Sequence, residues 1–286
     1  MQGKPNLKNW QLLPDLCPDG FLLSLTTLRQ WQFLFYEKSL NHPERYHLMR
    51  QPVTLQNNPL VSVILPLYNG ERFVRKAVNS VLRQTYPHFE LLIIDDGSDD
   101  KSQQQLPEDH RIRLFTRSNH GVAATRNFGI KLAKGELIAF IDQDDQWHPE
   151  KLAFQVKHML QNPDTGYLLT MMQNVLTGNT ECPYWLKPEL LEGAQLGLLP
   201  SSLMVKKEVF DRIGTFDEQL VNSSDSDWIF RADRNGIKRS VVDKVLLTRN
   251  IHDQNRSSDH EINKKEMFII LRRQIAARKR QETNEQ

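Results

Sequence analysis

The stretch LIAFIDQDDQW, residues 137–147, carries three carboxylates within four residues of an apolar run. Its first five residues have the length and composition of a buried parallel strand, and Asp142, Asp144 and Asp145 follow directly. In open α/β sheets, ligands bind outside the carboxyl ends of the strands. Clustered acids repel one another there, and a divalent cation such as Mn²⁺ or Mg²⁺ relieves the repulsion. The stretch fits a metal site, or alternatively an acidic turn that caps the helix after Pro149.

A second pair of acids, Asp95 and Asp96, follows another apolar run at residues 89–94. An aspartate carboxylate can accept the N3–H of a uracil ring, and Tyr68 offers an aromatic face for stacking. The pair therefore suggests a nucleoside pocket. The alternative is a turn cap in which Asp96 bonds the backbone of the turn that follows it.

A third pair, Asp225 and Asp227, lies at the start of a predicted helix. Either acid can act as a general base if it is held close to a hydroxyl nucleophile, or both can cap the helix and interact with its dipole. Arg126 can pair with a phosphate or a carboxylate, or lie on a solvated helix face. His252 can add a metal or phosphate contact, although a lone histidine is more often structural.

Alternating strands and helices are expected to position these residues. The strands are predicted at 61–65, 89–94, 112–115 and 137–141, and the helices at 73–82 and 122–132. Pro66 is expected to end the first strand. This order predicts a doubly wound α/β sheet with helices on both faces over about residues 60–160.

The rest of the chain adds further elements. Helices are predicted at 151–161 and just before Ile213, and strands at 167–172 and 241–247, while residues 203–205 form a short apolar run. The Gly- and Pro-rich stretch 177–200 is predicted to be a mobile, substrate-facing loop. Residues 1–58 are predicted to form a partly helical extension that docks on the main domain.

The C-terminal stretch 261–280 is predicted to be a basic amphipathic helix. Its apolar side holds Met267, Ile270, Leu271 and Ile275, and lysines and arginines surround it. Such a helix can lie on anionic lipid, which would suit a lipid-linked substrate. Packing against the domain is the alternative, and we prefer it.

Composition excludes several classes of protein. With 286 residues, 39% hydrophobic and 25% charged, the chain is typical of a globular protein, and its net charge of +2 argues against a nucleic-acid-binding surface. It has no apolar run of the ~18–20 residues that cross a bilayer, and its N-terminus lacks the pattern of a secretion signal. Cys17 and Cys182 form no CxxC pair. We therefore expect a cytoplasmic protein, located at the inner face of the cell membrane if the C-terminal helix binds lipid.

Taken together, the motifs resemble those of the family-2 glycosyltransferases, which have the GT-A nucleotide-sugar fold. The resemblance covers Pro59 to about His252. It rests on six segments in the family's order: VSVILPLYN (61–69), LLIIDDGSDD (91–100), GVAATRNFGI (121–130), FIDQDDQWHP (140–149), GTFDEQL (214–220) and SDSDWIFR (224–231). It implies a GT-A domain over residues 59–255, with an extension at 1–58 and a tail at 256–286.

On the donor side, the resemblance implies a role for each residue that matches a family motif. Pro66, Tyr68 and Asp96 would form the nucleoside pocket, with Asp95 nearby. Asp142-Gln143-Asp144 would be the family's DxD motif, in which Asp144 ligates Mn²⁺ or Mg²⁺ bridging the diphosphate and Asp142 approaches the ribose or the metal. His252 would lie near the diphosphate and the metal, and Arg126 is a further candidate contact to the nucleotide-sugar.

On the acceptor side, the resemblance implies that Asp225 is the catalytic base and that Trp228 lines the acceptor site. Members of the family often carry Glu directly before the base, whereas this chain has Ser224. This departure leaves the base open between Asp225 and Asp227.

The expected reaction is the transfer of a sugar from a nucleotide diphosphate, preferably UDP, to a hydroxyl of a glycan or lipid-linked acceptor. A single displacement assisted by the metal would invert the anomeric configuration. One alternative is a binding module that kept the fold and lost turnover. A sugar nucleotidyltransferase is less well supported, because residues 66–73 contain one glycine where a Gly-rich phosphate loop would be needed.

Overall fold

A mixed β-sheet forms the centre of the part of the chain that the computed structural model describes, which is residues 55–178, 181–183, 186–253, 255 and 259–284. Most of the predicted N-terminal extension lies outside the described residues. The strand order is β3-β2-β1-β4-β8-β6-β9-β5, and β7 pairs with β6. The strands are β1 (Val61–Leu67), β2 (Phe89–Asp95), β3 (Ile112–Thr116), β4 (Leu137–Phe140), β5 (Gln146–Trp147), β6 (Tyr167–Leu176), β7 (Gln195–Leu196), β8 (Met204–Lys206) and β9 (Arg239–Ile251).

The first four strands run parallel, so their carboxyl ends meet at one edge. Leu67 of β1 is opposite Asp95 of β2, and β4 pairs with β1 up to Ile64 and Phe140. The strand β8 then joins β4 antiparallel, which makes the sheet mixed rather than parallel throughout. The acids that follow β2 and β4 are thereby delivered to the same rim, on either side of β1.

Pro66 does not end β1, and this prediction is wrong. Leu67 O accepts a hydrogen bond from Asp96 N on the β2 side (2.8 Å), whereas Ile64 O accepts one from Ile141 N on the β4 side (3.1 Å). The missing N–H of Pro66 therefore faces β4, beyond the last paired residue of that strand. Because no ladder hydrogen bond is lost at that position, the strand continues through the proline.

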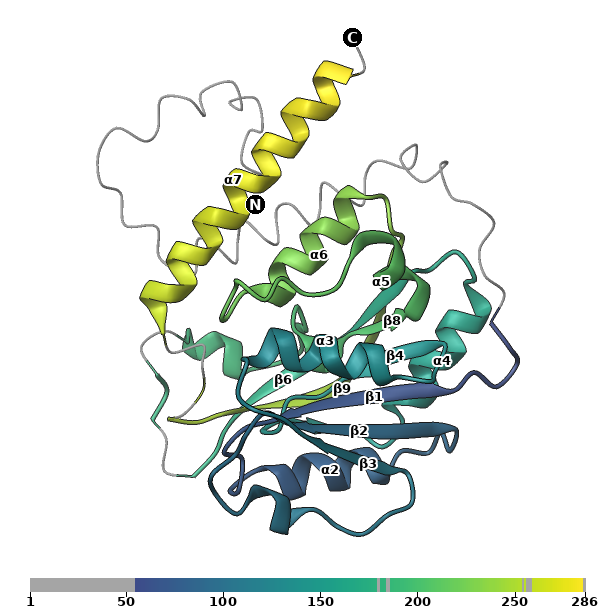
Figure 1. Cartoon of the computed structure of the whole chain (residues 1–286), viewed down its shortest axis with the longest axis vertical. Helices are drawn as coiled ribbons and strands as arrows, with labels where there is room; N and C mark the ends of the chain where they lie inside the picture. The colour runs from purple at the N-terminus through teal and green to yellow at the C-terminus, as the bar shows by residue number, and fades with distance from the viewer. Residues whose placement is uncertain (1–54, 179–180, 184–185, 254, 256–258, 285–286) are drawn as a thin grey trace, which may run out of the picture. The chain divides into compact units, whose positions relative to one another are not determined.

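Helices cover both faces of the sheet, as predicted (Figure 1). One hydrophobic core lies between the sheet and the helices α2 (Val74–Leu82) and α4 (Lys151–Gln161). The second core contains α3 (Val122–Leu132), α5 (Lys207–Ile213) and α6 (Ser224–Arg234). Alternation along β1 separates them, because Val63 and Leu65 join the first core and Ile64 joins the second.

The second half of the chain is more structured than its sequence indicated. The strands β6 and β9 are longer than predicted and pair in parallel along most of their length. The predicted loop 177–200 contains the short 3₁₀ helix η4 (Pro188–Leu191), the strand β7 and the start of η5 (Pro200–Ser202). Contact of this stretch with a substrate stays a prediction.

The C-terminal helix α7 (His260–Asn284) packs on the domain through its first half. Ile270 is completely buried, whereas 58% of Ile275 is exposed, so the predicted apolar side is split. The preferred packed arrangement therefore holds for the first half, and lipid contact stays a prediction. Within the described residues, no helix is both long and apolar enough to cross a membrane.

Candidate active site

Asp96 joins the ends of β1 and β2 to the start of α3. Its carboxylate accepts hydrogen bonds from Gly121 N (2.8 Å) and His120 N (3.1 Å), and Arg117 Nε lies 3.4 Å from it. Gly121 has φ 87°, a left-handed conformation that favours glycine. A carboxylate offers about four acceptor positions, so Asp96 can accept one further N–H donor.

Asp95, not Asp96, caps the turn that follows β2, so the predicted turn cap was assigned to the wrong residue. Asp95 is completely buried, and its carboxylate accepts bonds from Ser98 N (3.0 Å), Ser98 Oγ (2.6 Å) and Gln103 Nε2. Successive side chains along β2 point to opposite faces of the sheet, so Asp95 faces the turn and Asp96 faces away from it. Asp95 thus shapes the turn, and its predicted contact with a nucleotide stays a prediction.

Tyr68 and Gln143 connect the end of β1 to the turn after β4. Tyr68 N donates to Gln143 Oε1 (2.9 Å), and Gln143 Nε2 donates to Tyr68 O (3.0 Å). The amide packs so closely on Gly70 that a Cβ there would lie 2.6 Å from Gln143 Oε1. Tyr68 is 39% exposed and directly follows buried Leu67, the last residue of β1. An aromatic ring is therefore available at this rim.

Arg126 pairs with Asp142. Its Nη2 lies 2.5 Å from Asp142 Oδ1, and Asp142 N donates to Ser201 Oγ (3.0 Å). Arg126 is buried, with its guanidinium 5.8 Å from the ring centre of Phe216. The solvated-face alternative is therefore wrong, and the predicted pairing with a carboxylate is present.

Asp144 contacts the segment that follows β9. Its Oδ2 lies 2.9 Å from His252 Nε2 and 3.1 Å from Asn255 Nδ2, while Asn250 Nδ2 donates to Asp144 O (2.5 Å). His252 is buried and stacks on Phe73, with ring centres 4.3 Å apart. This histidine therefore lies against Asp144 from a part of the chain more than a hundred residues away.

The residues around Asp144 fit a divalent cation. Among the described residues, no three His, Cys, Asp or Glu side chains form a ready-made metal cluster. However, Mg²⁺-type ions are often held by one or two protein ligands together with substrate phosphates. Asp144 and His252 offer an oxygen and a nitrogen. Buried Asp145 indicates an excess of negative charge, because desolvation and then the charges of Asp144 and Asp142 raise its pKa well above the usual range.

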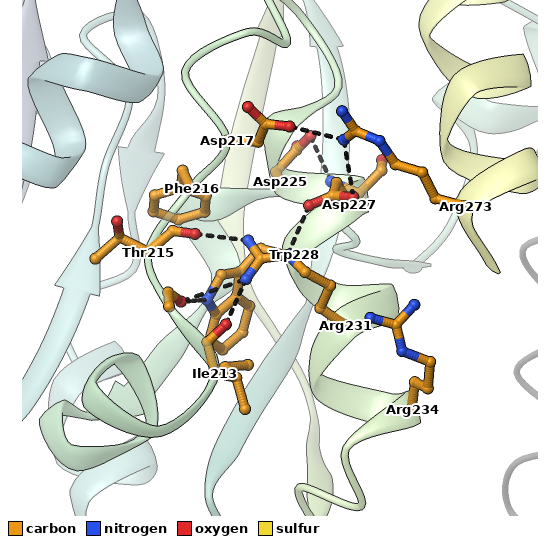
Figure 2. A network of polar contacts seen from close by, with 12 residues as sticks. Ile213, Thr215, Phe216, Asp217, Asp225, Asp227, Trp228, Arg231, Arg234 and Arg273 are labelled. Atoms are coloured by element: carbon orange, nitrogen blue, oxygen red, sulfur yellow. Dashed lines mark hydrogen bonds and ion pairs between the residues drawn. The ribbon is translucent and has the colours of Figure 1, made fainter. Parts of the chain in front are cut away.

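The two candidate bases have different surroundings. Asp227 is buried and pairs with Arg231 Nε at 2.7 Å (Figure 2). The carboxylate of Asp225 accepts a hydrogen bond from the neighbouring amide, Ser226 N, at 2.7 Å. Desolvation raises the pKa of Asp225, Arg126 opposes the rise, and Asp142 adds to it. Asp225 thus shares an electrostatic environment with the strand-end acids, whereas Asp227 is part of the helix packing.

Trp228 does not line an acceptor site. It is completely buried, its Nε1 donates to Gly214 O (3.0 Å), and its ring packs against Tyr167 and Phe210. The helical period of α6 turns Trp228, Ile229 and Ala232 toward the sheet. The implied acceptor role of Trp228 is therefore wrong.

Two contributors to this site were not predicted. Asn255 contacts Asp144, and its only sequence signal is its spacing of three residues from His252. Glu266, on α7, accepts hydrogen bonds from Val221 N (2.5 Å), Asn222 N (3.0 Å) and Ser223 N (2.8 Å), directly before the first residue of α6. No local pattern could identify Glu266, because its partners lie more than forty residues earlier in the chain.

Comparison with known proteins agrees with this arrangement. The family described as Glycosyl transferase family 2 matches residues 62–191. An uncharacterized glycosyltransferase of Rickettsia typhi is 30% identical over 227 residues, which cover 75% of this chain and 70% of that protein. An Escherichia coli protein, the UDP-Glc:alpha-D-GlcNAc-diphosphoundecaprenol beta-1,3-glucosyltransferase WfgD, is 44% identical over 106 residues, covering 36% of this chain and 42% of that protein.

A solved structure shares the fold. TarS 1–349 of S. aureus in complex with UDP-GlcNAc superposes with a TM-score of 0.56 and 25% identity, covering 70% of this chain and 60% of that chain. The fold is thus that of a GT-A glycosyltransferase. The chain belongs to glycosyl transferase family 2. It spans between 29% and 70% of the length of the relatives that it matches.

Proposed function

We propose that the protein transfers a sugar from a UDP-sugar to a hydroxyl group of a glycan or lipid-linked acceptor, with inversion at the anomeric carbon. The observation that carries this proposal is the position of Arg126. It pairs with Asp142 of the DxD motif, and its charge also lowers the pKa of Asp225. A donor diphosphate at the motif and an acceptor hydroxyl at Asp225 would therefore be neighbours.

The donor nucleoside would lie beside Tyr68 and Asp96. The exposed ring of Tyr68 can stack on a base, and the remaining acceptor capacity of Asp96 can bind a nucleobase N–H. The reciprocal bonds between Tyr68 and Gln143 would hold this pocket against the diphosphate site. The E. coli and S. aureus relatives, whose names include UDP-linked sugars, support UDP over other nucleotides.

Asp144 and His252 would hold Mn²⁺ or Mg²⁺ at the diphosphate, and Asp142 would approach the ribose or the metal. The bound cation would neutralise the charge that grows on the leaving diphosphate. Asn250 and Asn255 fix the orientation of Asp144 through its carbonyl and carboxylate. Asp142 is held by Arg126 and Ser201, which keeps the turn in place during the reaction.

Asp225 would remove the proton from the acceptor hydroxyl as it attacks the anomeric carbon. Its raised pKa makes it a stronger base than an exposed aspartate once it is ionised. Arg126 limits the rise and so keeps the carboxylate available. The protein groups thus orient the two substrates and accept one proton.

For the acceptor, the E. coli relative supports a sugar linked to a lipid through a diphosphate. Such an acceptor would bring the protein to the cytoplasmic face of the cell membrane, and the exposed part of α7 could contribute to that contact.

The experiment is to screen a panel of nucleotide-sugars for metal-dependent hydrolysis, and then to determine the anomeric configuration of the transferred sugar by proton NMR. A β-linked product from an α-linked UDP-sugar is expected. Retention of the α-configuration would reject the single displacement. Binding of UDP with Mn²⁺, without hydrolysis or transfer of any donor, would instead favour a binding module that has lost turnover.

A further inference from the structure

A polar cavity of about 210 Å³ lies beside the proposed base, between α6, the turn at residues 214–217 and α7. Its wall includes Asp217, Asp227, Arg231, Arg234, Arg273 and Gln274. Figure 2 shows the charged side chains gathered between the two helices. None of these residues takes part in the donor site.

Two of the arginines in the cavity wall are already compensated. Arg231 Nε pairs with Asp227 at 2.7 Å, and its other nitrogens donate to the carbonyl oxygens of Ile213 (2.7 Å) and Thr215 (2.6 Å). Arg273 pairs with Asp217 at 2.7 Å, and the hydrogen bond from Gln219 N together with this pair holds the pKa of the Asp217 carboxyl below its usual value. These pairs fix the walls and leave both aspartates neutralised.

Arg234 differs, because its partner is neutral. Its Nη1 donates to Gln274 Oε1 at 3.2 Å, and among the described residues no carboxylate pairs with it. The amide of Gln274 is thereby turned so that Nε2 is buried, and no acceptor within the described residues bonds to it. The cavity therefore presents an uncompensated guanidinium and an unsatisfied amide donor, which together suit an anion.

The cavity also has a suitable position. Asp227 lies in its wall, and Asp225 is two residues earlier in the first turn of the same helix. Arg234 is nine residues beyond Asp225, which corresponds to about 14 Å along a helix axis. An anion bound at Arg234 would therefore lie within the length of a short saccharide from a hydroxyl held at Asp225.

We propose that this cavity binds the phosphate or diphosphate group through which the acceptor glycan is linked to its carrier. Arg234 and the Gln274 amide are the binding groups, and the paired Arg231 and Arg273 shape the walls. The assignment rests on the proposed transfer to such an acceptor, and it adds a second anchoring point that aligns the acceptor hydroxyl with Asp225.

The first test is calorimetric titration of the full chain with inorganic pyrophosphate in EDTA, which suppresses binding at the metal-dependent donor site. Arg234→Gln removes the free charge, and Gln274→Glu places a carboxylate beside Arg234 in nearly the same shape. Each variant should weaken pyrophosphate binding roughly ten- to a hundredfold. Arg272→Gln is the matched control. It removes an exposed arginine from α7, the helix that carries Gln274, and should bind pyrophosphate like the wild type.

The second test compares two acceptor probes, a short GlcNAc oligosaccharide joined to a short lipid through a diphosphate and the octyl glycoside of the same oligosaccharide. Arg234→Gln should raise the KM for the diphosphate probe alone and leave donor hydrolysis unchanged. Pyrophosphate binding that does not depend on Arg234, or no such binding by the wild type, would overturn the proposal. If neither probe is glycosylated and no donor is hydrolysed, the proposed function fails, while the calorimetric result still decides whether the cavity is an anion site.

Discussion

In the strand-end region of the site (Asp96, Asp142, Asp144 and their contacts), Asp96 directly follows β2, and Asp142 and Asp144 lie in the turn after β4. In the helical region (the turn 214–217, α6 and α7), the acids lie on a helix that a second helix holds in place through Glu266. The strand-end acids follow strands that are held by backbone pairing, whereas the helix that carries Asp225 and Asp227 is held by side-chain contacts, from Glu266 to residues 221–223 and from Asp227 to Arg231. Changes to the two regions should therefore affect different steps, which are donor activation and acceptor alignment.

Asp144→Asn should have the largest effect of the changes that separate the regions. It removes the charged ligand proposed for the cation, and we expect transfer to fall on the order of a thousandfold. Initial rates over a Mn²⁺ titration measure this effect. Asp253→Asn is the matched control, because that acid is exposed and its ion-pair partner, Arg72, is exposed too, at 3.7 Å. Equal rates for the two variants would contradict the assigned role of Asp144.

The pH dependence of transfer tests whether the two regions are coupled through Arg126. Asp225 acts as a base only when ionised, and its pKa is raised above the usual value, so activity should be lost as the pH falls through that raised pKa. The rate should drop about tenfold per pH unit on the acid side. Arg126→Gln should move this acid limb to higher pH, because Arg126 lowers the pKa. A limb that stays in place would show that Arg126 and Asp225 are not coupled.

Glu266→Gln tests whether α7 supports the helical region. The change removes a buried charge that accepts three backbone N–H bonds, and we expect the free energy of unfolding to fall by about 1–3 kcal/mol. Transfer should fall several-fold, and more than donor hydrolysis does. Urea unfolding and the ratio of transfer to hydrolysis measure the two effects. Glu261→Gln, an exposed acid on the same helix, should leave both unchanged.

Gln143→Ala should have the smallest effect on the kinetics. It should change donor binding, which depends on the strand-end region, and leave acceptor binding unchanged. Loss of its two bonds to the Tyr68 backbone, at 2.9 and 3.0 Å, should raise the KM for the donor about fivefold. The KM for the acceptor should not change. Steady-state kinetics with each substrate varied in turn will show this, and a rise confined to the acceptor would contradict the division between the regions.

The same contrast explains what the sequence could predict. The acids at the ends of β2 and β4 follow apolar runs, so a local pattern identified both the strands and the rim where Asp96, Asp142 and Asp144 gather. Which of Asp95 and Asp96 caps the turn depends on the register of β2, which the pattern did not resolve.

The helical region was less predictable because it depends on contacts between distant residues. Trp228 was expected at the acceptor side, yet the face of α6 that meets the sheet was fixed by packing with Tyr167 and Phe210. No local pattern pointed to Glu266 or Arg234. Glu266 bonds to the loop before α6, and Arg234 bonds to Gln274 on α7, so both contacts join residues that are far apart in the chain. Pro66 shows the same dependence on distant residues. Because β4 stops pairing with β1 at Ile64, the missing N–H of Pro66 costs no hydrogen bond and β1 continues.

The most direct measurement is a comparison of transfer by Asp225→Asn and Asp227→Asn, with UDP binding and unfolding recorded for both. We predict that Asp225→Asn lowers transfer by about 10²–10⁴-fold while the variant stays folded and binds UDP. Asp227→Asn should keep turnover within about tenfold of the wild type and lose stability instead, because Arg231 loses its charged partner. Normal turnover by Asp225→Asn would contradict the account.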